Sequence, residues 1–321
     1  MAKVSIIVPV YNADKTIERC LESLVNQTLE EIELILVNDA STDGSYEKLL
    51  EFENKYQDKI IVVNCTENQG AGGARNVGLE IASGEYVGFV DADDFVKKDM
   101  FEKLYLKAAG GHLDVVDSEV YMMKSESVRE ALNDIFCDVV ISPEDREWMI
   151  LSDGYIVSKL IRREIIEEYG IRFRTGVKLE DADFLLKVML HADRIDVVRE
   201  PLYTYDNTAE NETWSVKESN EKEYRHIYEL IKTYIDILKT DERAKECRQA
   251  IEGALLHFYL SAVRCCLPQS GEMDRHNLYR LVEVRDKVRS CFRGGYDNKF
   301  FGQTATEDDV ELLKFVDKVK L

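Results

Sequence analysis

Three aspartates stand close together in the segment GEYVGFVDADDF, directly after the apolar run YVGFV. They are Asp91, Asp93 and Asp94. Carboxylates crowded in this way repel one another and lose solvation unless a cation or several donors face them. Because Mg²⁺ and Mn²⁺ prefer oxygen ligands, the cluster predicts a divalent metal site. The competing interpretation, acids that cap the following helix, accounts for one aspartate and leaves the other two unexplained.

Two other carboxylate motifs were compared with this cluster. A calcium-binding EF-hand loop fails because Phe95 and Val96 stand where an oxygen ligand and a glycine are required. A phosphatase of the haloacid-dehalogenase type also begins with strand-Asp-x-Asp, so a phosphohydrolase using Asp91 and Asp93 stays open as an alternative. Its nucleophile usually follows the first strand, however, and a Thr or Val usually stands where Phe95 is.

A second candidate site is the glycine-rich stretch NQGAGGARNVG. It lacks the third glycine of a dinucleotide fingerprint, because Arg75 stands there, and it lacks the lysine of a P-loop. We interpret it as a flexible turn, loosened by Gly72 and Gly73, that delivers Arg75 beside a helix N-terminus. Such a setting suits an anion such as a diphosphate.

Two further acidic segments have ordinary structural explanations when taken alone. In NDAST, Asp39 is either a turn former or an acceptor for the imide N–H of a nucleobase, for which Tyr11 offers a flat surface. In KLEDADF, Glu180, Asp181 and Asp183 stand at a predicted helix start, where acids favour the helix dipole.

The elements that must position these residues alternate between strand and helix patterns. Apolar strands are predicted at Val4–Val10, Glu33–Asn38, Ile60–Asn64 and Tyr86–Val90. Helices are predicted over 16–28, where Ile17, Cys20, Leu21, Leu24 and Val25 share one face, after Ser41 or Asp43, and over 74–82. Asp14 is the expected cap of the first helix.

Apolar strands alternating with helices predict an α/β fold with a parallel sheet covered on both faces. Ligands of such sheets bind beyond the carboxyl ends of the strands. The loops VYNAD, NDASTDGS, NCTENQGAGGARN and DADDF should therefore line one crevice. From 207 a polar linker that includes Trp214 leads to long helical patterns, so we predict domains over 1–206 and 207–321.

Composition excludes several classes of protein. The 321-residue chain carries 62 acidic and 42 basic side chains, a net charge of −20, which disfavours nucleic acid and anionic lipid as partners. Its seven cysteines form no Cys-x-x-Cys pair, and no apolar run approaches the length of a membrane span. We expect a soluble cytoplasmic protein without a transmembrane segment, which touches a membrane surface only transiently through its acceptor.

Taken together, SIIVPVYN, NDASTDGS, the pattern N-x-G-x-x-x-A-R-N-x-G and GEYVGFVDADD resemble the inverting glycosyltransferases of family 2, which have the GT-A fold. The resemblance covers about residues 3–205, with KLEDADF and PLYTY in the family's order. The Q-x-x-R-W signature of processive synthases is absent. The resemblance therefore implies a metal-dependent, non-processive enzyme of bacterial type. The predicted C-terminal helical appendage carries no such match.

The resemblance implies a nucleotide-diphosphate-sugar donor, usually a UDP-sugar, and a glycan or lipid-linked acceptor in surface polysaccharide synthesis. Asp39 and Tyr11 would hold the base, and Arg75 would approach the phosphates. Mn²⁺ or Mg²⁺ would be bound by Asp93 and Asp91, with Asp94 as a secondary ligand. The full set implied for the nucleotide sugar is Pro9, Tyr11, Asn12, Asp39, Asn68, Gly70, Arg75, Asp91 and Ala92.

By the same resemblance Asp181 would be the general base that deprotonates the acceptor hydroxyl during a single inverting displacement. Glu180 and Asp183 are less favoured for this role. A carboxylate at a helix N-terminus is kept ionised and only weakly basic, so we expect late proton transfer. A third possibility is a catalytically inactive, transferase-like binding protein whose C-terminal helices bind a partner.

Overall fold

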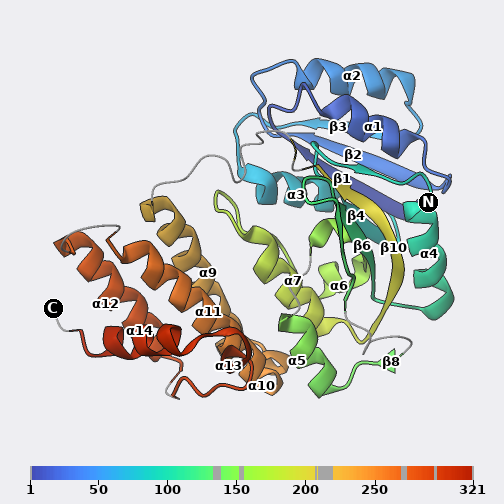
Figure 1. The fold of residues 1–321 in the computed structure, drawn as a ribbon. Helices are drawn as coiled ribbons and strands as arrows, with labels where there is room; N and C mark the ends of the chain where they lie inside the picture. Colours follow the sequence, from blue (N-terminus) through green and yellow to red (C-terminus); the bar gives the residue numbers. More distant parts are fainter. Residues whose placement is uncertain are drawn as a thin grey trace. The chain divides into compact units, whose positions relative to one another are not determined.

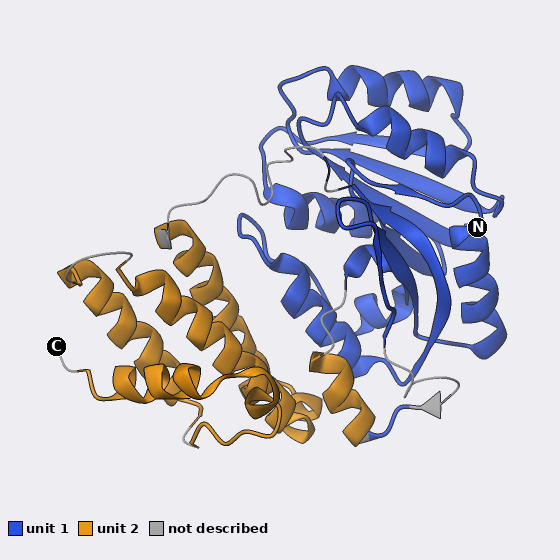
Figure 2. Ribbon diagram, in the orientation of Figure 1, with its two compact units in different colours: residues 1–142, 152–212 blue, residues 143–151, 213–321 orange. Residues whose placement is uncertain are grey.

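The structure is a computed structural model that describes residues 2–132, 139–151, 155–206, 208, 220–268, 273–292 and 295–319. The chain divides into two compact units (Figure 2). The first, which we call the α/β unit, comprises residues 1–142 and 152–212, and the second, the helical unit, comprises 143–151 and 213–321. The predicted linker with Trp214 lies largely outside the described residues, and the predicted boundary at 206 stays a prediction.

The α/β unit is built on a mixed sheet whose strands follow the order β3-β2-β1-β4-β9-β6-β10-β5. Within the described residues β7 pairs with β6 and β8 with β10. The strands are β1 (Val4–Val10), β2 (Ile32–Asn38), β3 (Ile60–Asn64), β4 (Tyr86–Phe89), β5 (Phe95–Val96), β6 (Val115–Met122), β7 (Ser127–Arg129), β8 (Val139–Val140), β9 (Lys159–Arg162) and β10 (Arg194–Tyr205).

The predicted parallel order holds for the first four strands of the chain, because β1 pairs in parallel with β2 and β4, and β2 with β3. Beyond β4 the sheet is mixed. Strand β9 runs antiparallel to both of its neighbours, β4 and β6, and β5 runs antiparallel to β10. The apolar runs predicted where strands lie, but strand direction depends on connections that an apolar pattern does not describe.

The helices of the α/β unit are α1 (Ile17–Val25), α2 (Ser45–Lys55), α3 (Gly70–Ile81), α4 (Met100–Gly111), α6 (Arg163–Glu168) and α7 (Glu180–His191), with a short 3-10 helix at Ile156–Ser158. Helices α1 and α2 cover one face of the sheet near β1–β3, and α3 covers the other (Figure 1). The predicted inner face of α1 is confirmed, since Ile17, Cys20, Leu21, Leu24 and Val25 are all buried.

One predicted helix cap and one predicted helix start are wrong. Helix α1 begins after Thr16, and no side chain caps it, because Asp14 instead uses its backbone N–H to bind Asp43 Oδ2 at 3.1 Å. Helix α2 begins at Ser45, and Asp43 Oδ1 accepts the Ser45 N–H at 3.0 Å. Both acids therefore tie the loops after β1 and β2 together at the helix starts.

The glycine-rich stretch is not a loop, which corrects the prediction that the helix begins near residue 74. Helix α3 already begins at Gly70, where φ is +75°, so Gly72 and Gly73 lie in its first turn. A Cβ on Gly72 would lie 2.2 Å from the backbone oxygen of Arg174, and one on Gly78 would lie 2.5 Å from Ile7 Cγ2. The glycines thus allow α3 to pack closely against β1 and against the segment before α7.

The helical unit confirms the predicted C-terminal helices. Its members are α5 (Pro143–Leu151), α9 (Asn220–Thr240), α10 (Glu242–Glu246), α11 (Arg248–Cys266), α12 (Arg275–Arg289), α13 (Phe301–Thr304) and α14 (Glu307–Asp317). Helix α11 packs against α9, α12 and α5 and is buried along most of its length. No helix in the described part of the chain is both long and apolar enough to cross a membrane.

Candidate active site

The loops that follow the first parallel strands meet at one edge of the sheet. The Asp39 N–H donates to the Val10 oxygen at 2.8 Å, and the Cys65 N–H donates to the Asn38 oxygen at 2.9 Å. Asn68 Nδ2 donates to the Asp39 backbone oxygen at 3.2 Å. These bonds connect the ends of β1, β2 and β3, so the predicted binding residues of three loops lie at a common edge.

Asp39 is buried at this edge, with 2% of its surface exposed. Its Oδ1 accepts the N–H of Gln69, just before α3, at 2.9 Å, while its Oδ2 is buried and has no hydrogen-bond partner among the described residues. Burial raises the pKa of Asp39 above its ordinary value. A buried acceptor without a donor is costly, so Oδ2 is suited to a ligand N–H.

The residues predicted around Asp39 differ in their surroundings. Tyr11 is 50% exposed, which leaves its ring free to stack on a flat ligand. Asn12 has a positive φ of 49° and its Oδ1 accepts the Thr42 N–H at 2.8 Å, so it fastens the loop after β1 to the loop after β2. Pro9 lies within β1, opposite Val37.

Arg75 forms the centre of the charged part of the site. Its Nη2 donates to Asp91 Oδ1 at 2.8 Å and its Nη1 to Glu180 Oε1 at 2.7 Å, while only 5% of the residue is exposed. The guanidinium thus joins the end of β4 to the start of α7, across 105 positions of sequence. Arg75 is directed at the acids, and its predicted contact with phosphate stays a prediction.

An aromatic cluster holds the start of α7 against this bridge. Phe173 stacks on Phe184 of α7 with ring centroids 3.9 Å apart, and Phe89 at the end of β4 meets both rings edge-on at 5.4 and 5.9 Å. Asn76 of α3 donates to the Phe173 oxygen at 2.9 Å and accepts its N–H at 2.9 Å. Close-packed rings of this kind leave little freedom to the residues that follow.

Asp181 lies on the first turn of α7, next to Glu180, and is half-buried. Burial raises its pKa to about 6, with Glu180 as a second raising influence that outweighs the lowering effect of Arg75. The expectation of a weakly basic carboxylate is therefore wrong, because desolvation and a neighbouring negative charge exceed the helix dipole. A base whose pKa lies near the working pH is well suited to proton abstraction.

Asp183 has a different role from its neighbour. It is completely buried, and it pairs with Arg174 at 2.6 Å and with Lys187 at 3.4 Å. Both of its oxygens face cations that belong to the surrounding segment and to α7 itself. We therefore regard Asp183 as a structural residue that fixes α7.

The three aspartates after β4 do not face the same way. Asp91 and Asp93 are half-buried, whereas Ala92 and Asp94 between and after them are buried. Asp94 Oδ2 accepts the Tyr203 hydroxyl at 2.5 Å and its Oδ1 accepts the Asp206 N–H at 2.8 Å. Burial, with the charges of Asp91 and Asp93, raises the pKa of Asp94 to about 8. Asp94 thus anchors the end of β10 from inside the fold.

The model of the family described as "Glycosyl transferase family 2" matches residues 5–170 of this chain. A Bacillus subtilis protein named uncharacterized glycosyltransferase EpsJ is 31% identical over 90% of this chain and 86% of its own length. The chain belongs to glycosyltransferase family 2. This assignment removes the phosphohydrolase alternative, in agreement with the ion pair that engages Asp91.

A further relative and two solved structures are similar to this chain. The poly(ribitol-phosphate) β-N-acetylglucosaminyltransferase TarS of Staphylococcus aureus is 31% identical over 81% of this chain and 45% of its own length. The crystal structure of TarS 1–349 with UDP-GlcNAc matches 98% of this chain and 90% of that chain, with a TM-score of 0.72 and 23% identity. A mannosyltransferase from Pyrobaculum calidifontis, solved with GDP-Man and Mn²⁺, matches 99% of this chain and 88% of its own, with a TM-score of 0.56 and 18% identity. The predicted GT-A fold is confirmed.

The three predicted metal ligands do not converge on one point. Among the described residues no group of three or more His, Cys, Asp and Glu side chains could hold a metal, so Asp91, Asp93 and Asp94 do not form one cluster. Asp91 is 34% exposed and its Oδ2 accepts no hydrogen bond from the described residues. A site of one or two carboxylates fits Mg²⁺, whose other ligands are usually water and substrate phosphate.

Several residues at the site were missed by the sequence analysis. Arg19 of α1 donates to the Asp93 backbone oxygen at 2.8 Å and pairs with Asp206 at 2.6 Å. The Tyr203 hydroxyl accepts the Asp91 N–H at 3.2 Å in addition to its bond to Asp94. A strand-forming PLYTY segment carries no local signal for such contacts, because the partners are more than 100 residues away.

Proposed function

We propose that this family 2 glycosyltransferase moves a sugar from a UDP-sugar to a glycan or lipid-linked acceptor in surface polysaccharide synthesis, with inversion and with help from Mn²⁺ or Mg²⁺. The observation that carries the proposal is Asp181. Its pKa of about 6 and its place beside the Arg75 bridge suit a general base next to a diphosphate site.

Nucleotide binding is assigned to the edge formed by the loops after β1, β2 and β3. The unpartnered Asp39 Oδ2 would accept the imide N–H of uracil, and the exposed Tyr11 ring would cover the base. Asn12, Asn68, Gly70 and Ala92 would shape the remaining wall. The similarity in fold to TarS, solved with UDP-GlcNAc, supports a uridine nucleotide.

The metal is assigned to Asp91 Oδ2 and Asp93. Asp94 would hold this segment in place through its hydrogen bonds to Tyr203 and Asp206. When bound, a divalent ion would neutralise the charge that develops on the departing diphosphate. Arg75 limits the repulsion between Asp91 and Glu180 while the donor is absent, since it pairs with both. The Mn²⁺ in the Pyrobaculum calidifontis neighbour supports the use of a divalent ion with this fold.

In the reaction Asp181 takes the proton of the acceptor hydroxyl as that oxygen attacks the anomeric carbon from the face opposite the diphosphate. The bond from the anomeric carbon to the acceptor oxygen forms while the bond to the phosphate oxygen breaks. A single displacement inverts the anomeric configuration. With a pKa of about 6, Asp181 is about nine-tenths ionised at pH 7.

The test compares Asp181→Asn with Asp93→Asn. Asp181→Asn is expected to bind UDP with Mn²⁺ normally in a thermal-shift assay and to transfer sugar at least about a hundredfold more slowly. Asp93→Asn is expected to lose the Mn²⁺-dependent part of the shift while its unliganded melting temperature stays unchanged. Normal transfer by Asp181→Asn would place the base elsewhere, and an absence of turnover in the natural chain with every donor and acceptor tried would favour the inactive binding protein.

A further inference from the structure

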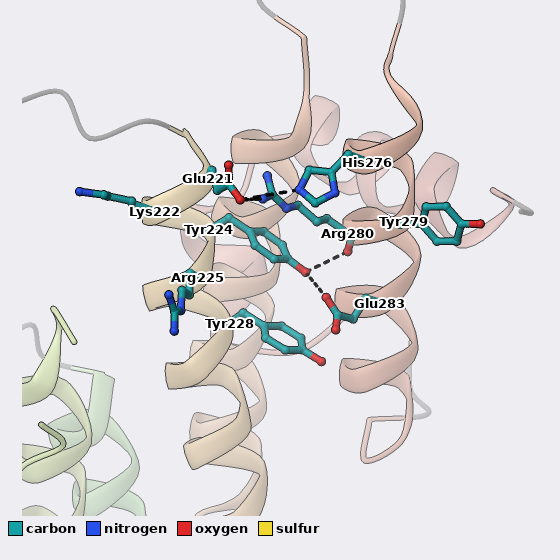
Figure 3. A pocket seen from close by; sticks show the side chains of 9 residues that line it. All are labelled: Glu221, Lys222, Tyr224, Arg225, Tyr228, His276, Tyr279, Arg280 and Glu283. Carbon is teal, nitrogen blue, oxygen red and sulfur yellow. Dashed lines mark hydrogen bonds and ion pairs between the residues drawn. The ribbon is translucent and has the colours of Figure 1, made fainter. Parts of the chain in front are cut away.

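The helical unit contains a pocket between α9 and α12 that the proposed chemistry does not use (Figure 3). Its volume is about 670 Å³, enough for a ligand of several sugar units. It lies at the N-terminal ends of the two helices, so the positive ends of both helix dipoles are near it. The lining residues are Glu221, Lys222, Tyr224, Arg225, Tyr228, His276, Tyr279, Arg280 and Glu283.

The floor of this pocket is held in place by its own hydrogen bonds. Tyr224 is 5% exposed, and its hydroxyl binds the Arg280 backbone oxygen and Glu283 Oε2, each at 3.1 Å. The Arg280 guanidinium lies 5.3 Å from the centre of the Tyr224 ring and pairs with Glu221 at 2.6 Å. A floor that is already ordered costs a ligand little conformational entropy.

Aromatic surface is concentrated in the same place. The rings of Tyr224 and Tyr228 lie parallel, 5.7 Å apart, on α9. Tyr279 of α12 also lines the pocket and is 57% exposed, so its ring is accessible to a ligand. Tyrosine offers a flat apolar face together with a hydroxyl, a combination suited to polyols and sugars, whose own surfaces mix C–H and O–H groups.

The pocket lining contains more basic than acidic side chains, unlike the chain as a whole. The lining has three permanently charged cations and two carboxylates, whereas the chain as a whole carries −20. Arg280 is paired, but Lys222 and Arg225 are exposed and neither forms an ion pair with the described residues. Guanidinium and ammonium groups without a partner favour phosphate as the ligand.

We propose that this pocket binds a phosphate-bearing polyol or sugar of the acceptor chain. This assignment rests on the proposed function and names its acceptor class. A flat anionic membrane or a nucleic acid duplex would bring a long row of negative charges to a chain whose net charge is −20. A single flexible chain presents one or two phosphates to the pocket, and charges farther than about 10 Å are screened at 0.1 M salt.

The experiment measures binding of short poly(ribitol phosphate) chains to the full-length protein by isothermal titration calorimetry at about 0.1 M salt. The test variant is the double substitution Lys222→Gln with Arg225→Gln, at two exposed positions. Its matched control is Lys239→Gln with Lys245→Gln, which removes the same charge from the C-terminal end of α9 and from α10. Lys239 lies about 25 Å along α9 from Lys222, beyond the screening length.

The test variant is expected to bind the phosphate polymer on the order of tenfold more weakly, and the control within about twofold of the natural chain. Tyr279→Ala is expected to weaken binding by a similar factor at unchanged charge. Equal weakening by both charge pairs, or no weakening by either, would overturn the proposal.

Three further probes separate the sources of binding. Neutral dextran oligomers that bind as well as the polymer would overturn the role of phosphate. Inorganic phosphate that competes as strongly as the polymer would mean an adventitious ion only. Vesicles containing phosphatidylglycerol that bind in place of the polymer would mean a membrane surface.

Failure of the pocket and failure of the proposed function are distinguishable. Asp181→Asn is expected to keep full polymer binding while it loses transfer. If polymer binding depends on Lys222 and Arg225 but no UDP-sugar is turned over, the pocket assignment is supported and the proposed function is contradicted. If sugar is transferred but the polymer does not bind, the proposed function is supported and the pocket assignment is contradicted.

Discussion

The two units each contain short ion pairs, but these pairs lie in different surroundings. In the α/β unit the Arg75 side chain is 6% exposed and lies 2.7–2.8 Å from two carboxylates. In the helical unit the Arg264 side chain is 58% exposed and lies 2.5 Å from Asp309. The distances are similar, yet only the first pair has given up most of its water. Burial, more than distance, decides what a lost partner would cost.

The same difference appears in the acids. In the α/β unit burial raises the pKa of Asp181 to about 6 and that of Asp94 to about 8. In the helical unit hydrogen bonds from Thr306 lower the pKa of Asp309, which belongs to the capping box of α14. A carboxylate whose pKa is raised in this way can exchange protons near neutral pH. The raised pKa that the proposed proton transfer requires is therefore found at Asp181, whereas the pKa of Asp309 is shifted in the opposite direction.

The largest loss of stability is expected when Arg75 is replaced. Replacing it by Met leaves Asp91 and Glu180 close together without their cation, and removing one partner of a buried ionic bridge costs about 3–5 kcal/mol. Urea-induced unfolding measures this loss. Arg75→Lys keeps the positive charge, but its ammonium group can pair well with only one of the two carboxylates. This variant is expected to lose less stability than the Met variant. A cost below about 1 kcal/mol for the Met variant would show that the bridge behaves like a surface pair.

A smaller effect is expected at Tyr203. Tyr203→Phe removes the donor to Asp94 and the acceptor for the Asp91 N–H, for an expected loss of about 1–3 kcal/mol. Tyr205, two positions along β10, provides the matched control, because its hydroxyl has no hydrogen bond within the described part of the chain. Tyr205→Phe should unfold at nearly the same urea concentration as the natural chain. Equal losses in both variants would contradict a specific role for the Asp94 anchor.

The pH dependence of transfer tests the raised pKa of Asp181. The base must be ionised to accept a proton, so activity is present above pH 6 and is lost as pH falls through the pKa of about 6. Below that pH, kcat/KM is expected to fall about tenfold per unit. Rates at saturating Mn²⁺, on protein shown to stay folded, measure this fall. A profile that stays flat down to pH 4.5 would mean that Asp181 behaves as an ordinary surface aspartate.

The smallest effect is expected in the helical unit. Arg264→Gln breaks the pair with Asp309 at a site where solvent replaces it, so the loss should lie below about 1 kcal/mol. Asp309 would keep its hydrogen bonds with Thr306, in which its Oδ2 accepts the Thr306 N–H and its own N–H donates to the Thr306 hydroxyl, and these bonds cap α14. Urea-induced unfolding in low and high salt measures the difference. A loss comparable to that of Arg75→Met would erase the contrast between the units.

Much of the α/β unit could be predicted from local pattern. The four parallel strands and the buried face of α1 follow from runs and spacings of apolar side chains, which must leave water whatever surrounds them. The start of α3 could not be predicted in this way, because three glycines in its first turn oppose helix formation. Contact with the Arg174 backbone, which admits only glycine at position 72, overrides that local preference.

Which residues could do chemistry was determined by the sequence, since acids placed after apolar strands in a parallel sheet must gather at one edge. What each acid does was decided only by the tertiary structure. Asp94 is directed inward to Tyr203, Asp183 is held by Arg174, and Asp181 alone is left half-buried with a raised pKa. The physical reason is that desolvation and pairing depend on partners about a hundred residues away as well as on neighbours, and only folding brings them within hydrogen-bond distance.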